Sequence, residues 1–166
     1  MKIIGITLLA ILLAGGAYVW KIEFGEDEVF ILPEGYTGVV YIFYNRDDGE
    51  PVKYEQGKRL YVIPPNGILK TQFSLETRWH HFGEYYYKQK SGNLIRIPFM
   101  FKGTDMESKK DSDPNAVHVC CGSSGNAGRG QGEPRVVFEH FYVGTDEEIH
   151  AASEKGGKIN PIELVN

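Results

Sequence analysis

Two histidines and two cysteines form the group of side chains in this sequence that is best suited to chemistry. His118-Val119-Cys120-Cys121 precedes Glu139-His140, with a glycine-rich stretch between the two motifs. If the strands that carry them pair antiparallel, His118, Cys120 and His140 share one face, because alternate residues of a strand point the same way. Imidazole and thiolate groups bind soft or borderline metal ions. One hypothesis is therefore a metal site formed by His118, Cys120, Cys121 and His140, with the strand register left open.

The adjacent cysteines also allow chemistry without a metal. Cys120 and Cys121 are the only cysteines of the chain, so in an oxidising compartment they can pair only with each other or with another chain. A bond between neighbouring cysteines closes a small ring and is more easily reduced than an ordinary disulfide. Two free thiols are a further alternative. A cysteine nucleophile activated by His118 is another, although no orienting group is evident.

Aromatic residues gather in a second candidate region. Trp79 stands in a Trp-His-His-Phe run, and Tyr85, Tyr86 and Tyr87 follow it closely. Exposed aromatic rings on a β-sheet can stack on sugar rings or hold a protein partner. In a strand about half of such side chains face inward, so core packing explains many of them.

The composition describes one folded, acidic domain. The chain has 166 residues, 42% of them hydrophobic, and a formal net charge of −4. Nucleic-acid binding normally needs a basic surface, so no nucleic-acid partner is expected. The glycine-rich stretch 122–134 does not match a phosphate-binding loop, because Gln131 stands where that motif needs lysine. No cofactor is predicted.

Residues 1–20 predict export. Lys2 precedes an uncharged run from Ile3 to Trp20, and small residues follow its strongly apolar part. This segment is either a signal peptide cleaved after Gly16 or Ala17, or an uncleaved N-terminal membrane helix. A lipoprotein attachment site is absent here, because Gly16 stands where the lipid-modified cysteine would be.

Short apolar segments separated by turn residues predict a single all-β domain over residues 24–166. The expected strands are 29–32, 39–44, 58–63, 68–73, 82–89, 94–101, 116–121 and 135–143. Their number and spacing are typical of an antiparallel β-sandwich. Pro98 places its strand at a sheet edge or at a bulge. Thr145 and Glu148 form a capping-box pattern, which predicts a short C-terminal helix ending near Gly156.

The stretch from Phe30 to Phe73 resembles a bacterial family of extracytoplasmic domains of unknown function. The shared pattern is F-x-L-P-E-G-Y-x-G, an apolar strand, and then G-x-x-x-Y-x-I-P-x-N-G-x-x-x-T. The matching positions are Pro33, Glu34, Gly35, Tyr36, Gly38, Gly57, Tyr61, Ile63, Pro64, Asn66, Gly67 and Thr71. The resemblance implies a domain behind a signal peptide, lipobox or single N-terminal helix, and it implies no activity. The strand order is also loosely like transthyretin-type and carboxypeptidase-regulatory sandwiches, which is a fold analogy only.

Together these observations favour a non-catalytic module of the cell envelope that binds or supports another component. The expected partners are the membrane, through the N-terminal helix, and an envelope protein or glycan. A metal- or thiol-dependent activity around His118, Cys120, Cys121 and His140 is one alternative. Carbohydrate binding through Trp79 and Tyr85–Tyr87 is the other.

Overall fold

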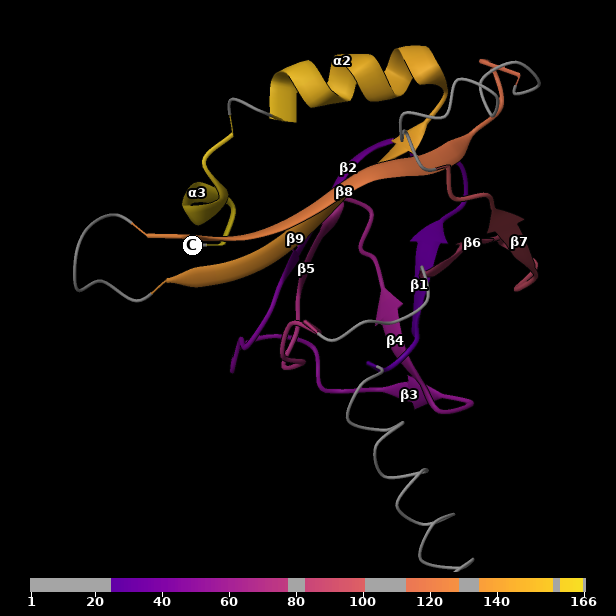
Figure 1. Cartoon of the computed structure of the whole chain (residues 1–166). Helices are drawn as coiled ribbons and strands as arrows, with labels where there is room; N and C mark the ends of the chain where they lie inside the picture. Colours follow the sequence, from indigo (N-terminus) through magenta and orange to yellow (C-terminus); the bar gives the residue numbers. More distant parts are fainter. Residues whose placement is uncertain (1–24, 78–82, 101–112, 129–134, 157–158, 166) are drawn as a thin grey trace, which may run out of the picture.

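The computed structural model describes residues 25–77, 83–100, 113–128, 135–156 and 159–165. The predicted strands are present, and two helices follow them (Figure 1). The strands are β1 (Glu28–Pro33), β2 (Gly38–Phe43), β3 (Tyr54–Glu55), β4 (Lys58–Val62), β5 (Ile68–Lys70), β6 (Glu84–Lys88), β7 (Leu94–Ile97), β8 (His118–Ala127) and β9 (Val136–Gly144). The helices are α2 (Asp146–Gly156) and α3 (Pro161–Val165).

The strands form two packed sheets, and both sheets are mixed. The five-stranded sheet has the order β3-β4-β1-β6-β7, and the four-stranded sheet has the order β5-β2-β9-β8. β1 runs parallel to β4 and β6, and β2 runs parallel to β5. The two-sheet packing agrees with the predicted sandwich, but the expectation of purely antiparallel pairing was wrong.

The parallel pairs follow from how the chain alternates between the sheets. β1 and β2 are consecutive but lie in different sheets, and so do β4 and β5. The step from β4 to β5 repeats the step from β1 to β2, so each later strand lies parallel to its earlier counterpart. Hydrophobic patterning identifies strands but carries no information on which of them pair.

Single bridges add pairing beyond the named strands at two places. Phe99, just after edge strand β7, bridges Val119 of β8, and Glu50 bridges Thr71 beyond the end of β5. Val119 donates its backbone N–H to the carbonyl of Pro98 at 2.9 Å. β7 ends at Ile97, directly before Pro98, and lies at a sheet edge, which is one of the two positions predicted for this strand. The residues after it pair with the other sheet.

The core between the sheets is rich in stacked aromatic rings. Phe30 of β1 lies 4.9 Å from both Tyr61 and Tyr85, and Phe141 of the opposite sheet meets it edge-on at 5.4 Å. The buried members of this core are Phe30, Leu32, Val40, Ile42, Tyr44, Tyr61, Ile63, Leu69, Phe73, Tyr85, Ile97, Val119, Phe141 and Val143. They come from both sheets, so this cluster holds the sandwich together.

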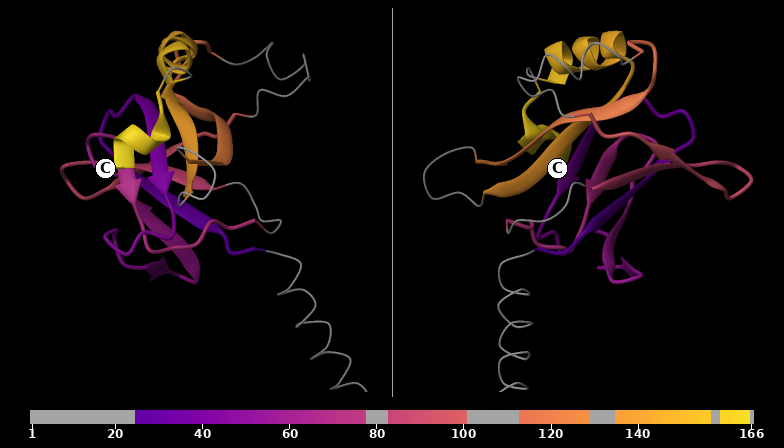
Figure 2. Two further views of the ribbon diagram at one scale, coloured as in Figure 1. Left: turned by 90° about the vertical axis from the view of Figure 1, so that its left-hand side faces the viewer. Right: turned by 45° about the vertical axis from the view of Figure 1, so that its right-hand side comes forward.

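The helices pack on the outer face of the four-stranded sheet (Figure 2). Ile149 of α2 contacts Cys120 and Tyr142, and Val165 of α3 packs with Tyr41 and Phe43. The predicted capping box begins α2: Glu148 N–H donates to the Thr145 hydroxyl at 3.3 Å, and Thr145 N–H donates to the Glu148 carboxylate at 2.9 Å. These bonds satisfy amide groups that the first helical turn leaves unpaired.

The glycine-rich stretch is in part a β-strand. Residues 122–127 continue β8 and pair with β9 as far as Val136. Gly125 lies opposite Phe138, and a β-carbon on Gly125 would already reach ordinary contact distance from that ring. Glycine thus suits a strand position that faces a large aromatic neighbour.

The predicted signal peptide or membrane helix, residues 1–20, lies outside the described residues. Within the part of the chain that the structure describes, neither helix has the length and hydrophobicity needed to cross a bilayer.

Candidate functional site

His118 and Cys120 lie where β8 passes beneath α2. Along β8, His118 and Cys120 point toward α2, while Val119 between them belongs to the core. The register places His118 opposite Gly144 and Cys120 opposite Tyr142. Strand alternation therefore brings a histidine and a cysteine to one face, as predicted.

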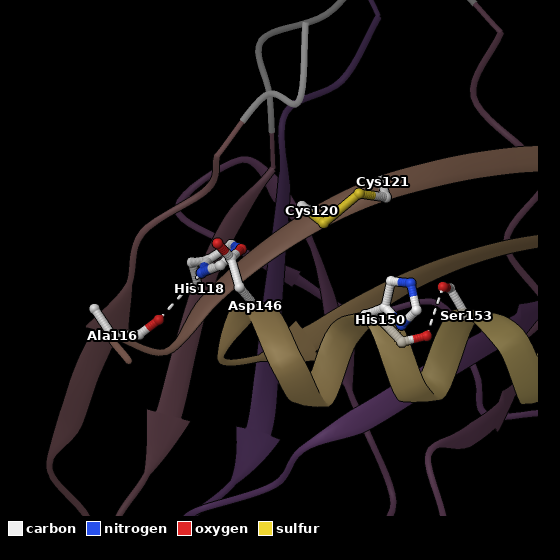
Figure 3. The surroundings of a disulfide bond; sticks show 7 residues. All are labelled: Ala116, His118, Cys120, Cys121, Asp146, His150 and Ser153. Carbon is white, nitrogen blue, oxygen red and sulfur yellow. Dashed lines mark hydrogen bonds and ion pairs between the residues drawn. A yellow bond between two sulfur atoms is a disulfide. The ribbon is translucent and has the colours of Figure 1, made fainter. Parts of the chain in front are cut away.

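Cys120 and Cys121 form a disulfide with each other (Figure 3). The two halves of this bond have different surroundings: Cys120 is fully buried against Tyr142 and Ile149, whereas Cys121 is exposed. Cys121 also has a φ of 61°, in the left-handed region that side chains with a β-carbon rarely adopt. Of the alternatives that the sequence left open, the structure contains the vicinal pair and no free cysteine.

A β-bulge coincides with the disulfide. The register of β8 against β9 shifts between Cys120 and Ser123, so that Cys121 and Gly122 lie across from Phe141 alone. An extra residue in one strand forces a local kink, and bulges of this kind often use a residue in the left-handed conformation. Cys121 lies in this bulge and is exposed, whereas Cys120, in the regular part of the ladder, is buried.

His118 lies under the first turn of α2 (Figure 3). Its Nδ1 donates to the carbonyl of Ala116 at 3.1 Å, which leaves Nε2 as the second ring nitrogen. Nε2 lies 3.5 Å from Oδ1 of Asp146, a contact that becomes an ion pair when the ring is protonated. At 1% exposure, His118 is sealed from solvent, and within the described structure Nε2 has no hydrogen-bond partner.

His140 of β9 occupies an aromatic environment. It pairs with Ser123 in the ladder, beyond the bulge, so it lies opposite neither cysteine. Its ring lies 5.5 Å from Tyr142, 5.6 Å from Tyr41 and 6.3 Å from Phe138. Burial lowers the pKa of His140 below its usual 6.5 because the charged form is poorly solvated there.

The structure does not assemble the predicted metal ligands into a site. Among the described residues, no group of three or more His, Cys, Asp and Glu side chains is placed to hold a metal ion. The thiolates that a soft metal would need are absent, since both sulfurs belong to the disulfide. His140 is separated from Cys120 by the bulge.

The predicted aromatic binding region is divided by strand alternation. Tyr85 is 6% exposed and stacks on Phe99 at 5.9 Å, so it belongs to the core. Tyr87 also points inward; its hydroxyl donates to the carbonyl of Tyr36 at 2.5 Å, and burial raises its pKa to about 12. Tyr86 is half-buried on the outer face, and its hydroxyl donates to Glu84 at 3.1 Å. Trp79 lies outside the described residues.

A cleft beside α2 is the feature that sequence reasoning missed. It has a volume of about 400 Å³. Its lining residues are Thr37, Gly38, Val39, Glu148, Ala151, Ala152, Lys155, Gly156 and Ile159. The small alanine side chains on this side of α2 leave the space open, and two charged residues of opposite sign flank an apolar lining. The capping-box pattern predicts where the helix begins, but no sequence signal shows which strand the helix packs against.

The two halves of the sequence motif meet at Tyr36 and Gly67. The Tyr36 hydroxyl donates to the carbonyl of Val39 at 2.5 Å. Any β-carbon on Gly67, whose φ is 74°, would overlap that hydroxyl. Asn66 accepts the Ile68 N–H at 3.1 Å and completes the turn. These residues fix the turns at the start of β2 and β5, so the structure gives the motif a role in folding.

The fold and the site define a two-sheet, mixed β domain with a vicinal disulfide under a C-terminal helix. The model of a family of unknown function, DUF6843, matches residues 25–152, and the chain belongs to that family. No curated protein matches the sequence. A crystal structure described as a "Putative Lipoprotein from Bacillus anthracis" has a similar fold, with a TM-score of 0.52 and 20% identity over 74% of this chain and 71% of that chain.

Proposed function

We propose that this chain is an exported domain, held at the membrane by residues 1–20, that acts as a non-catalytic binding or structural module of the cell envelope. The observation that carries the proposal is the uncharged run from Ile3 to Trp20, placed directly before the folded domain. As a helix this run is about 27 Å long, near the thickness of the hydrocarbon core of a bilayer.

Glu26, near the start of the described residues, is held to the domain by an ion pair, as a point of attachment to a membrane helix requires. Arg59 of β4, with a side chain only 7% exposed, donates from Nε to the Glu26 carboxylate at 2.6 Å. The same guanidinium donates to the carbonyl of Ser74 at 2.6 Å and lies over the ring of Phe73 at 5.0 Å. A force on the N-terminal segment would therefore be transmitted through Arg59 to the five-stranded sheet.

The domain then presents its helical end away from the attachment point. β1 begins at the end of the five-stranded sheet where β3 lies, with β4 between the two strands, and this end is far from α2 (Figure 1). The cleft beside α2 and the exposed Cys121 would face a partner in the envelope. Two further observations agree with export: disulfides form and persist mainly in oxidising compartments, and the fold is shared with a protein described as a "Putative Lipoprotein".

Fractionation of bacteria that express the full chain tests this proposal. We expect the membrane fraction to contain the chain with its intact, full-length mass. We also expect protease to digest the domain when it is added to cells whose outer envelope has been permeabilised. Leu8→Arg with Leu9→Arg places two charges in the apolar run and should release the chain from membranes. Leu8→Val with Leu9→Val keeps the run apolar and is the matched control.

Each alternative outcome has a definite meaning. A soluble product outside the cytoplasm that lacks the first 16 or 17 residues would leave export standing and would exclude the membrane attachment. A full-length chain in the cytoplasm, protected from protease, would exclude both.

A further inference from the structure

The two sulfurs of the Cys120–Cys121 bond differ in accessibility. Cys120 is 0% exposed beneath α2, and Cys121 is on the surface. A thiolate attacks a disulfide at one sulfur and displaces the other, so the reaction needs access to the sulfur that is attacked. Only the Cys121 sulfur offers that access while the domain is folded.

The bulge confines the consequences of opening the bond to a short segment. The ladder is intact on both sides of it, with Cys120 opposite Tyr142 and Ser123 opposite His140. Cys121 is held at a φ of 61°, which is unfavourable for a residue with a β-carbon. Opening the disulfide frees this residue and Gly122 to relax, while the paired strands and α2 keep their places.

The surroundings of Cys120 protect its sulfur. Cys120 packs against Tyr142 and against Ile149 of α2, so its sulfur stays out of reach of an external thiolate. His118, two residues earlier on the same face, is 1% exposed and has a buried Nε2 without a hydrogen-bond partner in the described structure. Asp146 at 3.5 Å is the acidic group that faces this nitrogen. His118 and Cys120 share one face of β8, so the buried imidazole lies on the same side of the strand as the sulfur that leaves.

We propose that the Cys120–Cys121 disulfide is a thiol-exchange site at which a dithiol attacks the Cys121 sulfur. The first thiolate bonds to Cys121 Sγ, the Cys120–Cys121 bond breaks, and its electron pair stays on Cys120 Sγ, which takes up a proton. The second thiol of the dithiol then displaces Cys121. Two electrons and two protons pass to the protein, and the dithiol becomes a disulfide. This inference does not depend on the membrane attachment.

The test uses the full chain, purified in mild detergent and kept folded. The protein is equilibrated with dithiothreitol and then alkylated, and the labelled cysteines are located by peptide mass spectrometry. We expect reduction without denaturant, with Cys121 alkylated at least about tenfold faster than Cys120, because Cys120 reacts only after local opening. Labelling that requires denaturant, or equal labelling of the two cysteines, would overturn the proposal.

Single serine variants sharpen the test with oxidised glutathione as the probe. Cys120→Ser leaves Cys121 without a neighbour to displace the adduct, so one stable glutathione adduct should accumulate. Cys121→Ser is the matched control: its remaining thiol is buried and should stay unmodified under the same conditions. An adduct on both variants, or on Cys121→Ser alone, would contradict the assignment of Cys121 as the attacked sulfur. The wild-type labelling rates decide the matter if either variant does not fold.

Discussion

The four-stranded sheet has two faces that are built differently. Its inner face meets the other sheet through large apolar and aromatic side chains, among them Phe141 and Val143. Its outer face carries His118, Cys120 and His140, and α2 and α3 pack on parts of this face. The same strands supply both faces, because successive residues alternate between them.

This difference between the two faces assigns global stability to the inner face and reactive groups to the outer face. The inner face joins segments that are far apart in the sequence, so its loss should unfold the whole domain. The outer face is covered by elements added at the C-terminal end of the chain, and it can change locally. This second face carries the disulfide, which can open, and two buried ring nitrogens, one each in His118 and His140, that have no hydrogen-bond partner in the described structure.

The largest expected losses of stability are those of Phe30→Ala and Ile149→Ala, which test the inner and the outer face in turn. Both side chains are almost fully buried, at 1% and 2% exposure, but one lies between the sheets and the other under α2. Phe30→Ala should cost about 3–5 kcal/mol of global stability in urea unfolding. Ile149→Ala should cost about 2–5 kcal/mol, expressed mainly as faster hydrogen exchange in α2.

Hydrogen exchange that rises throughout both sheets in Ile149→Ala would show that α2 unfolds together with the sandwich. Mutations on the inner and the outer face would then both affect global unfolding, and the proposed difference between the faces would be wrong.

Gly67→Ala tests the rim of the inner face, where the two halves of the family motif meet. Gly57→Ala is its matched control, because the φ angles are similar at 74° and 81° but only Gly67 is enclosed, by Tyr36 and the Val39 carbonyl. The left-handed conformation costs an alanine about 1–2 kcal/mol at either site. Overlap at Gly67 should add about 1–3 kcal/mol, measured as a lower urea midpoint. Equal losses in the two variants would show that Tyr36 moves aside without cost.

The inner face could be predicted from the sequence more fully than the outer face. Alternating apolar residues located the strands, and Thr145 with Glu148 located the start of α2. The parallel pairing of β1 with β4 could not be predicted, because it depends on which sheet each strand joins. The face shared by His118 and Cys120 followed from alternation, whereas the bulge that separates His140 from them depends on the exact register.

The smallest expected effect concerns His140, which sharpens the comparison because burial on the outer face is incomplete. Its pKa is lowered from 6.5 in the folded state. As the pH falls through about 6.5, His140 is therefore protonated in the unfolded chain but not in the folded chain. The free energy of unfolding decreases until the pH falls below the pKa of the folded state. Each unit of pKa difference corresponds to about 1.4 kcal/mol.

His140→Phe keeps an aromatic ring beside Tyr41 and Tyr142 but cannot take up a proton. Urea unfolding at about pH 7.5 and about pH 5.5 should show a smaller loss of stability on acidification for this variant than for the wild type. His150→Gln, which removes an exposed histidine from α2, is the control and should retain the wild-type difference. If His140→Phe and the wild type lose the same stability, the ring of His140 accepts its proton in the folded domain, and the outer face is open to water at this point even though α2 and α3 cover its neighbours.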